Sequence, residues 1–154
     1  ELACGLQIGK QTVNAIYDWD NYSTYYHKDL LGANNNIIIS SPVISGPKVY
    51  ELINLLKEKQ MSGVQITIVT WAPDSYRFGD AAYWMQLHED MRQAGFYIKT
   101  VEESCERFAV IDQEVVWYGN INLLAKDKVD DSIMRILSKE IASELMEITF
   151  GDNG

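Results

Sequence analysis

The sequence lacks a surplus of basic residues and any long apolar run, and each absence excludes a class of protein. Thirteen basic side chains stand against twenty-two acidic ones, so the net charge of the 154-residue chain is −9. A domain that grips duplex DNA unaided is usually basic, because phosphate neutralisation supplies most of the affinity. Any phosphate recognition must therefore occur in a local positive pocket or with help from a partner domain. The longest apolar runs, such as residues 37–39, are far too short to cross a bilayer, so no membrane association is expected.

Cysteine and histidine are also scarce. The two cysteines, Cys4 and Cys105, are too few for a disulfide framework, which predicts a protein of the reducing cytoplasm. The two histidines, His27 and His88, do not make a metal site, and neither a metal nor a cofactor is predicted. No basic leader precedes a long apolar segment, so no secretory signal is expected. The chain begins at Glu1 rather than at methionine, which predicts a fragment of a longer protein.

Helical and strand patterns alternate along a chain whose length fits one domain. The consecutive apolar residues at 37–39 and the largely apolar strand at 64–70 are typical of strands that are buried on both faces. The pattern therefore predicts an α/β layered fold, with helices on both faces of a mixed, mostly parallel sheet of six or more strands. Residues 1–20 are expected to be a lead-in segment. Helices are expected over 21–33, 47–61, 81–93 and 139–146, and further strands over 96–101 and 133–137, with a hairpin over 107–118.

The hairpin contains the side chains that could bind a ligand or take part in a reaction. Side chains two apart in a strand share a face, so Cys105 and Arg107 are expected to point the same way, as are Asn120 and Asn122. Asp112 lies where the chain reverses, which brings the far ends of the hairpin together. A thiol, a guanidinium and two amides would then form a small cluster. Such donors can hold an anionic oxygen.

The spacing of these residues resembles the signature of the phospholipase D superfamily of phosphodiesterases. That signature is His-x-Lys, four residues, Asp, about half a dozen residues, then Gly-Ser or Gly-Gly followed by x-Asn. This chain has Cys105-Glu106-Arg107, residues 108–111, Asp112, residues 113–118 and Gly119-Asn120-Ile121-Asn122. Asp112, Gly119 and Asn122 match the pattern. The resemblance implies an αβα sandwich over residues 21–150, with Asp112 among the catalytic positions.

The departures fall on the residues that perform the family's chemistry. In the family the histidine attacks phosphorus, lysine and asparagine hold the phosphate oxygens, and a second histidine protonates the leaving oxygen. Cys105 stands in place of the histidine, Arg107 in place of the lysine and Asn120 in place of the usual serine. A thiol acidified beside Arg107 could be nucleophilic, but it is a poor acid for an alkoxide. The resemblance therefore implies degenerate catalytic positions at Cys105, Arg107 and Asp112, with phosphate binding by Arg107, Asn120 and Asn122.

The resemblance extends through most of the chain. The stretch HKDLLGANNNIIISSPVIS is similar to the family's opening helix, strand and Ser-Pro turn, and VVWYGNINLLAKDKVDDSIMRI is similar to the version fused to the ends of DNA and RNA helicases. This implies an upstream helicase domain, with DNA or RNA as a binding partner. The family places two signatures in one active site, whereas this chain has one, which predicts a homodimer.

Three functions remain open from the sequence. The first is a non-catalytic domain that binds phosphate or nucleic acid or assists assembly; the second is an active nuclease that uses Cys105; the third is a purely structural dimerisation module. In simpler interpretations Cys105 fills the core, Arg107 pairs with Glu106, Glu114 or a carboxylate near residues 130–131, and the asparagines cap a turn or a short helix. The contiguous His27-Lys28-Asp29 has the wrong spacing and is predicted to be a solvated helix face, and His88 is predicted to be surface or half-buried.

Overall fold

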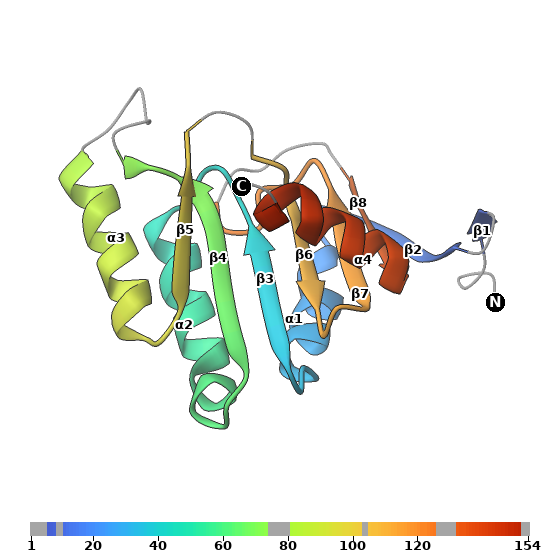
Figure 1. Ribbon diagram of the computed structural model, residues 1–154, viewed down its shortest axis with the longest axis horizontal. Helices are drawn as coiled ribbons and strands as arrows, with labels where there is room; N and C mark the ends of the chain where they lie inside the picture. Colours follow the sequence, from blue (N-terminus) through green and yellow to red (C-terminus); the bar gives the residue numbers. More distant parts are fainter. Residues whose placement is uncertain (1–5, 9–10, 74–80, 103–104, 126–131, 152–154) are drawn as a thin grey trace.

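A computed structural model (Figure 1) describes residues 6–8, 11–73, 81–102, 105–125 and 132–151. Within these ranges eight strands form a single sheet in the order β1-β2-β8-β7-β6-β3-β4-β5. The predicted hairpin, β6 and β7, lies inside this sheet, as expected. The strands are β1 (Leu6–Ile8), β2 (Gln11–Asp18), β3 (Asn36–Ser40), β4 (Gln65–Trp71), β5 (Tyr97–Val101), β6 (Phe108–Ile111), β7 (Val115–Gly119) and β8 (Ser132–Leu137).

The strand directions divide the sheet into two halves. The pairs β3–β4 and β4–β5 are parallel, and the other five pairs among the described strands are antiparallel. The sheet is mixed, as predicted, but the expectation that it is mostly parallel is wrong. The apolar runs correctly indicated buried parallel strands in one half. The hairpin sets the strand directions in the other half, because β6 pairs antiparallel with β3, β7 pairs antiparallel with β6, and β8 pairs antiparallel with β7.

Helices cover both faces of the sheet, which confirms the predicted layered architecture (Figure 1). Ile37 and Ile39 of β3 pack into a core with three helices, and Ile38 between them packs into a second core with the fourth helix. This alternation explains why three consecutive isoleucines are all buried. No helix in the described ranges is long and apolar enough to span a bilayer. The first core holds α1 (Tyr22–Leu31), α2 (Gly46–Met61) and α3 (Ala81–Gln93); the second holds α4 (Lys139–Met146), which a short π-helix (Glu147–Gly151) follows.

The predicted lead-in over residues 1–20 contains two of the strands. β2 pairs antiparallel with β8 from Thr12 opposite Leu137 to Asp18 opposite Ser132. Its register shifts between Val13 and Ala15, so the period-two alternation that marks a strand in a sequence is interrupted. This irregularity explains why the sequence pattern did not reveal β2.

Two predictions about polar helix residues are wrong. Asp29 is not on a solvated face: its carboxylate accepts hydrogen bonds from Arg135 Nε at 2.6 Å, from a terminal amino group of Arg135 at 2.9 Å and from Trp117 Nε1 at 2.8 Å. His88 is not at the surface, since only 1% of it is exposed. The helical stripes of apolar residues did not indicate that Asp29 is paired with strand residues or that His88 is buried.

Candidate functional site

The geometry of the site begins with the turn between β6 and β7. Asp112 and Gln113 adopt positive φ angles of 56° and 58°, which reverse the chain tightly. The strands then pair from Ile111 opposite Val115 to Phe108 opposite Tyr118. The chain before Phe108 therefore lies beside the chain after Tyr118, at the end of the hairpin opposite the turn.

Arg107 and Asn122 meet at this end of the hairpin. Nε of Arg107 donates a hydrogen bond to Oδ1 of Asn122 at 3.0 Å, and both residues are partly exposed. This contact confirms that the hairpin brings its two ends together. Within the described part of the chain, the terminal amino groups of Arg107 and the side-chain amide N–H groups of Asn122 have no protein partner. Several donors on two side chains are thus available to one anionic ligand.

Cys105 lies beside Ser40, at the carboxyl end of β3. Its Sγ is 3.5 Å from Oγ of Ser40, and that hydroxyl donates its own hydrogen to the carbonyl oxygen of Glu106 at 2.6 Å. Burial raises the pKa of Cys105, and this outweighs the opposing effects of the Ser40 hydrogen bond and of the charge on Arg107. The charge on Arg107 lowers the pKa of this thiol, as expected, but burial is the larger effect, so the thiol is not acidified overall.

Glu106 does not form an ion pair with the guanidinium of Arg107. Instead its carboxylate accepts a hydrogen bond from the hydroxyl of Tyr118 at 2.9 Å, which raises the pKa of Tyr118. Among the described residues Arg107 forms no ion pair. The acidic residues at 130–131, which the sequence offered as another partner, lie outside the described residues. Nor do the described residues hold a group of three or more His, Cys, Asp or Glu side chains suited to a metal ion.

Gly119 and Asn120 connect β7 to this site. A Cβ on Gly119 would lie 2.4 Å from the carbonyl oxygen of Ser132 and 2.6 Å from Cα of Ile133, so the close approach of β8 requires glycine here. The backbone N–H of Asn120 donates to the same Ser132 oxygen at 3.2 Å. The Asn120 side chain is exposed and makes no hydrogen bond in the described ranges. The structure does not bring it into contact with Arg107.

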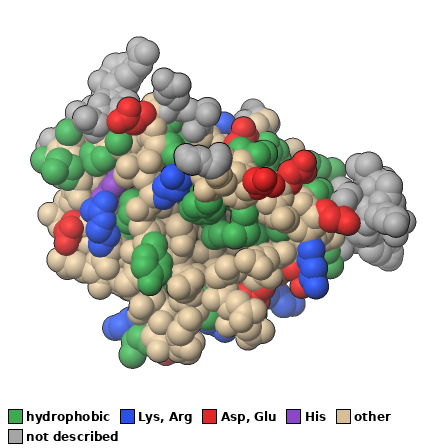
Figure 2. All heavy atoms as spheres, viewed as in Figure 1, with side chains coloured by type: hydrophobic (Ala, Val, Ile, Leu, Met, Phe, Trp, Pro, Cys, Tyr) green, Lys and Arg blue, Asp and Glu red, His purple; other side chains and the backbone are tan. Residues whose placement is uncertain are grey.

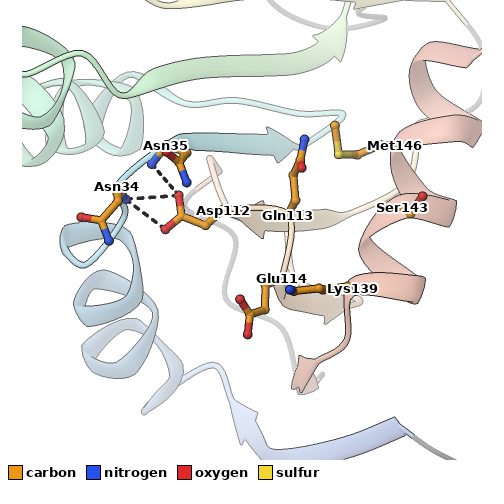
Figure 3. A pocket seen from close by; sticks show the side chains of 8 residues that line it. All are labelled: Asn34, Asn35, Asp112, Gln113, Glu114, Lys139, Ser143 and Met146. Carbon is orange, nitrogen blue, oxygen red and sulfur yellow. Dashed lines mark hydrogen bonds between the residues drawn. The ribbon is translucent and has the colours of Figure 1, made fainter.

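Asp112 lies at the other end of β6 from Arg107. Its carboxylate accepts hydrogen bonds from the backbone N–H groups of Asn34 and Asn35, the shortest at 2.7 Å (Figure 3). It also accepts one from the backbone N–H of Asn36 at 3.1 Å. These bonds tie the β6–β7 turn to the loop between α1 and β3. The structure therefore does not bring Asp112 together with Cys105 and Arg107, and its contacts are those of a structural residue.

A hollow of about 650 Å³ opens beside Asp112, at the end of the hairpin away from Arg107 (Figure 3). Its walls are mostly polar and come from the α1–β3 loop, the β6–β7 turn and α4. Nothing in the sequence pattern predicted it. The residues that line it are Asn34, Asn35, Asp112, Gln113, Glu114, Lys139, Ser143 and Met146.

Two serines that the sequence analysis left unassigned position the site. Ser40 holds the chain at Glu106, as described above. Ser41 is fully buried, and its Oγ donates to the carbonyl oxygen of Val43 at 2.7 Å and accepts from the backbone N–H of Leu124 at 3.2 Å. This links the Ser-Pro turn after β3 to the segment that follows Asn122. The turn signal was visible in the sequence, but its long-range partner was not.

Comparison with known proteins identifies the family. A family model described as "Cardiolipin synthase, PLD-like domain" matches residues 26–150. The chain belongs to this family of phospholipase D-like domains. A search of curated proteins finds no significant match.

Several solved structures share the fold of the chain at low sequence identity. Nuc from Salmonella typhimurium, described as a phospholipase D family member, has 15% identity and a TM-score of 0.69 over 90% of this chain and 91% of its own. NucT from Helicobacter pylori has 8% identity and a TM-score of 0.65 over 87% and 91%. TrmBL2, an archaeal chromatin protein whose structure is described as showing a novel mode of DNA binding, has 13% identity and a TM-score of 0.60 over 86% and 49%. At these identities the likeness establishes the fold alone.

Proposed function

We propose that this chain is a phospholipase D-like domain that has lost phosphodiester hydrolysis and binds a phosphate group of nucleic acid at Arg107 and Asn122. The observation that carries the proposal is the hydrogen bond between these two residues. It fixes the plane of the guanidinium while leaving its terminal amino groups available. A planar fork of donors beside an amide matches the oxygens of one phosphate group.

The state of Cys105 supports the loss of hydrolysis. A thiol with a raised pKa supplies little thiolate at neutral pH, so it is a weak nucleophile toward phosphorus. Protonation of the leaving alkoxide also requires an acid with a pKa near neutrality, a task that suits histidine. His27 lies on α1 and His88 is buried on α3. Neither belongs to the site at the end of the hairpin.

The wider context is proposed from the sequence. We infer a cytoplasmic domain attached to a helicase-type protein, because residues 115–136 are similar to the helicase-fused version of the family. We also infer a homodimer, because the chain has one signature where the family uses two. The net charge of −9 disfavours general contact with duplex DNA, so binding is confined to the few donors of the site.

A binding titration with a thymidine dinucleotide phosphodiester tests this function. Arg107→Ala should weaken binding about ten-fold to 150-fold, as expected for the loss of charge-assisted hydrogen bonds of about 1.5–3 kcal/mol. Arg92→Ala is the matched control, because Arg92 lies on α3 and its one ion pair among the described residues is an exposed pair with Glu89. Equal affinity in wild type and Arg107→Ala would contradict the proposal.

An activity assay separates the alternatives. The wild-type chain should not hydrolyse bis(p-nitrophenyl) phosphate. Hydrolysis that disappears in Cys105→Ser would instead establish an active phosphodiesterase with an unusual nucleophile. Absence of both hydrolysis and binding, in a chain that is dimeric, would favour the structural module.

A further inference from the structure

Three aromatic rings form a column that runs from the core to the surface. Trp117 of β7 is fully buried, and Tyr17 of β2 stacks on it with ring centroids 5.2 Å apart. Tyr25 of α1 stacks on Tyr17 in turn, at 4.8 Å and an angle of 26° between the ring planes. Tyr25 ends the column and is 48% exposed. Near-parallel rings at these distances form an offset stack that another planar ring can extend.

A cavity of about 220 Å³ lies beside the two tyrosines. It is lined by Tyr17, Tyr25, Lys28, Asp29 and Arg135. Asp29 holds Arg135 through two hydrogen bonds, whereas the exposed Lys28 has no ion-pair partner among the described residues. Drug-sized ligands occupy cavities of about 300–1,000 Å³, so this space suits a single planar ring with an attached anionic group. Two cations against one carboxylate make the lining positive.

The column lies near the candidate phosphate site. Tyr17 pairs with Ile133 of β8, and Ile133 pairs with Gly119 of β7, three residues before Asn122. Two strand spacings separate Tyr17 from Gly119, which is about 10 Å. Trp117 belongs to the core on the α1 side of the sheet, Tyr17 packs against that core, and Tyr25 lies on α1 itself. The opposite side, which Figure 2 presents, carries acidic side chains around α4, including the exposed Glu140 and Glu144, and would repel a nucleic-acid backbone.

We propose that Tyr25, supported by Tyr17 and Trp117, is a stacking platform for a base of single-stranded nucleic acid, with Lys28 contacting the adjacent phosphate. The proposal rests on the proposed function, since a strand bound at Arg107 reaches the column within a few nucleotides. Stacking requires an unpaired base, and the acidic chain offers too few cations to hold a duplex. Such stacking tolerates any base, because every base presents a ring face.

The test compares a short oligothymidylate, an oligouridylate and an abasic oligonucleotide of the same length in fluorescence-anisotropy titrations. The two strands with bases should bind the wild-type chain more tightly than the abasic strand. Tyr25→Ala should weaken their binding about 5-fold to 150-fold, with no effect on the abasic strand. Tyr25→Trp should restore it. Tyr97→Ala is the control, because Tyr97 is similarly exposed but lies on β5, at the far edge of the sheet.

The outcomes separate this proposal from the phosphate site. Arg107→Ala should weaken all three oligonucleotides, with or without bases. Equal wild-type affinity for the abasic strand and the strands with bases would overturn the stacking platform while leaving the phosphate site intact. Equal effects of Tyr25→Ala on all three strands would also overturn it. Absence of binding to any of them would overturn both proposals.

Discussion

Substitution of Asp112 should change the stability of the fold without changing phosphate binding. Its carboxylate accepts hydrogen bonds from three successive backbone N–H groups, those of Asn34, Asn35 and Asn36. At about 1 kcal/mol net for each bond, given their partial exposure, removal of the carboxylate costs about 3 kcal/mol. Alanine is also strained at the positive φ of 56°, which adds about 1 kcal/mol. We therefore expect Asp112→Ala to lower the free energy of unfolding by about 3–4 kcal/mol.

Chemical denaturation of matched variants measures this contribution. Asp112→Gly removes the carboxylate without the strain, so it should cost less than alanine. Gln113→Gly is the control: the neighbouring residue has a φ of 58°, and glycine there should be neutral or stabilising by up to about 1 kcal/mol. Phosphate binding by folded Asp112→Ala should equal that of the wild type. An unchanged unfolding midpoint, or a folded variant with abolished phosphate binding, would refute this reasoning.

Two further predictions concern stability. Burial lowers the pKa of His88 below its ordinary 6.5. As the pH falls through 6.5, the unfolded chain therefore takes up a proton at this histidine before the folded chain does. The free energy of unfolding should therefore decrease as the pH falls through the ordinary histidine pKa of 6.5. His88→Leu should reduce that slope, and an identical slope in the variant would contradict the prediction. Gly119→Ala should lower the free energy of unfolding by about 1–3 kcal/mol, because its Cβ would meet backbone atoms of Ser132 and Ile133. Gly32→Ala is the control and should cost less, because its Cβ would lie 3.5 Å from its nearest neighbour. Thermal or chemical unfolding measures both.

Much of the fold was predictable because its signals are local. The helix over residues 81–93 and the closing helix over 139–146 were predicted with the bounds that the structure has, from apolar spacing and flanking residues. The buried strand at Ile37–Ile39 was evident from its uniform apolar character. Strand direction is different, because it depends on which strands pair across the sheet. The sequence of the hairpin does not indicate which strand lies beside β6, so its antiparallel pairing with β3 could not be predicted.

The candidate site was predictable only in part, for the same reason. The proximity of Arg107 to Asn122 follows from the register of one hairpin, which is a local property. The raised pKa of Cys105 depends on its burial by packed elements, and its neighbour Ser40 lies sixty-five residues earlier in the chain. The position of Asp29 likewise depends on Arg135 and Trp117, which reach it from two strands distant in sequence. Long-range polar contacts of this kind leave no periodic signal in the sequence.

Phosphorus NMR of a thymidine dinucleotide phosphodiester mixed with the wild-type chain tests the central claim most directly. A single spectrum series reports both binding and hydrolysis of the same phosphate. We expect the diester resonance to shift or broaden on addition of the protein and to do so far less with Arg107→Ala, with no monoester signal after prolonged incubation. A monoester signal that grows with time, or a diester resonance that the protein leaves unchanged, would contradict the account.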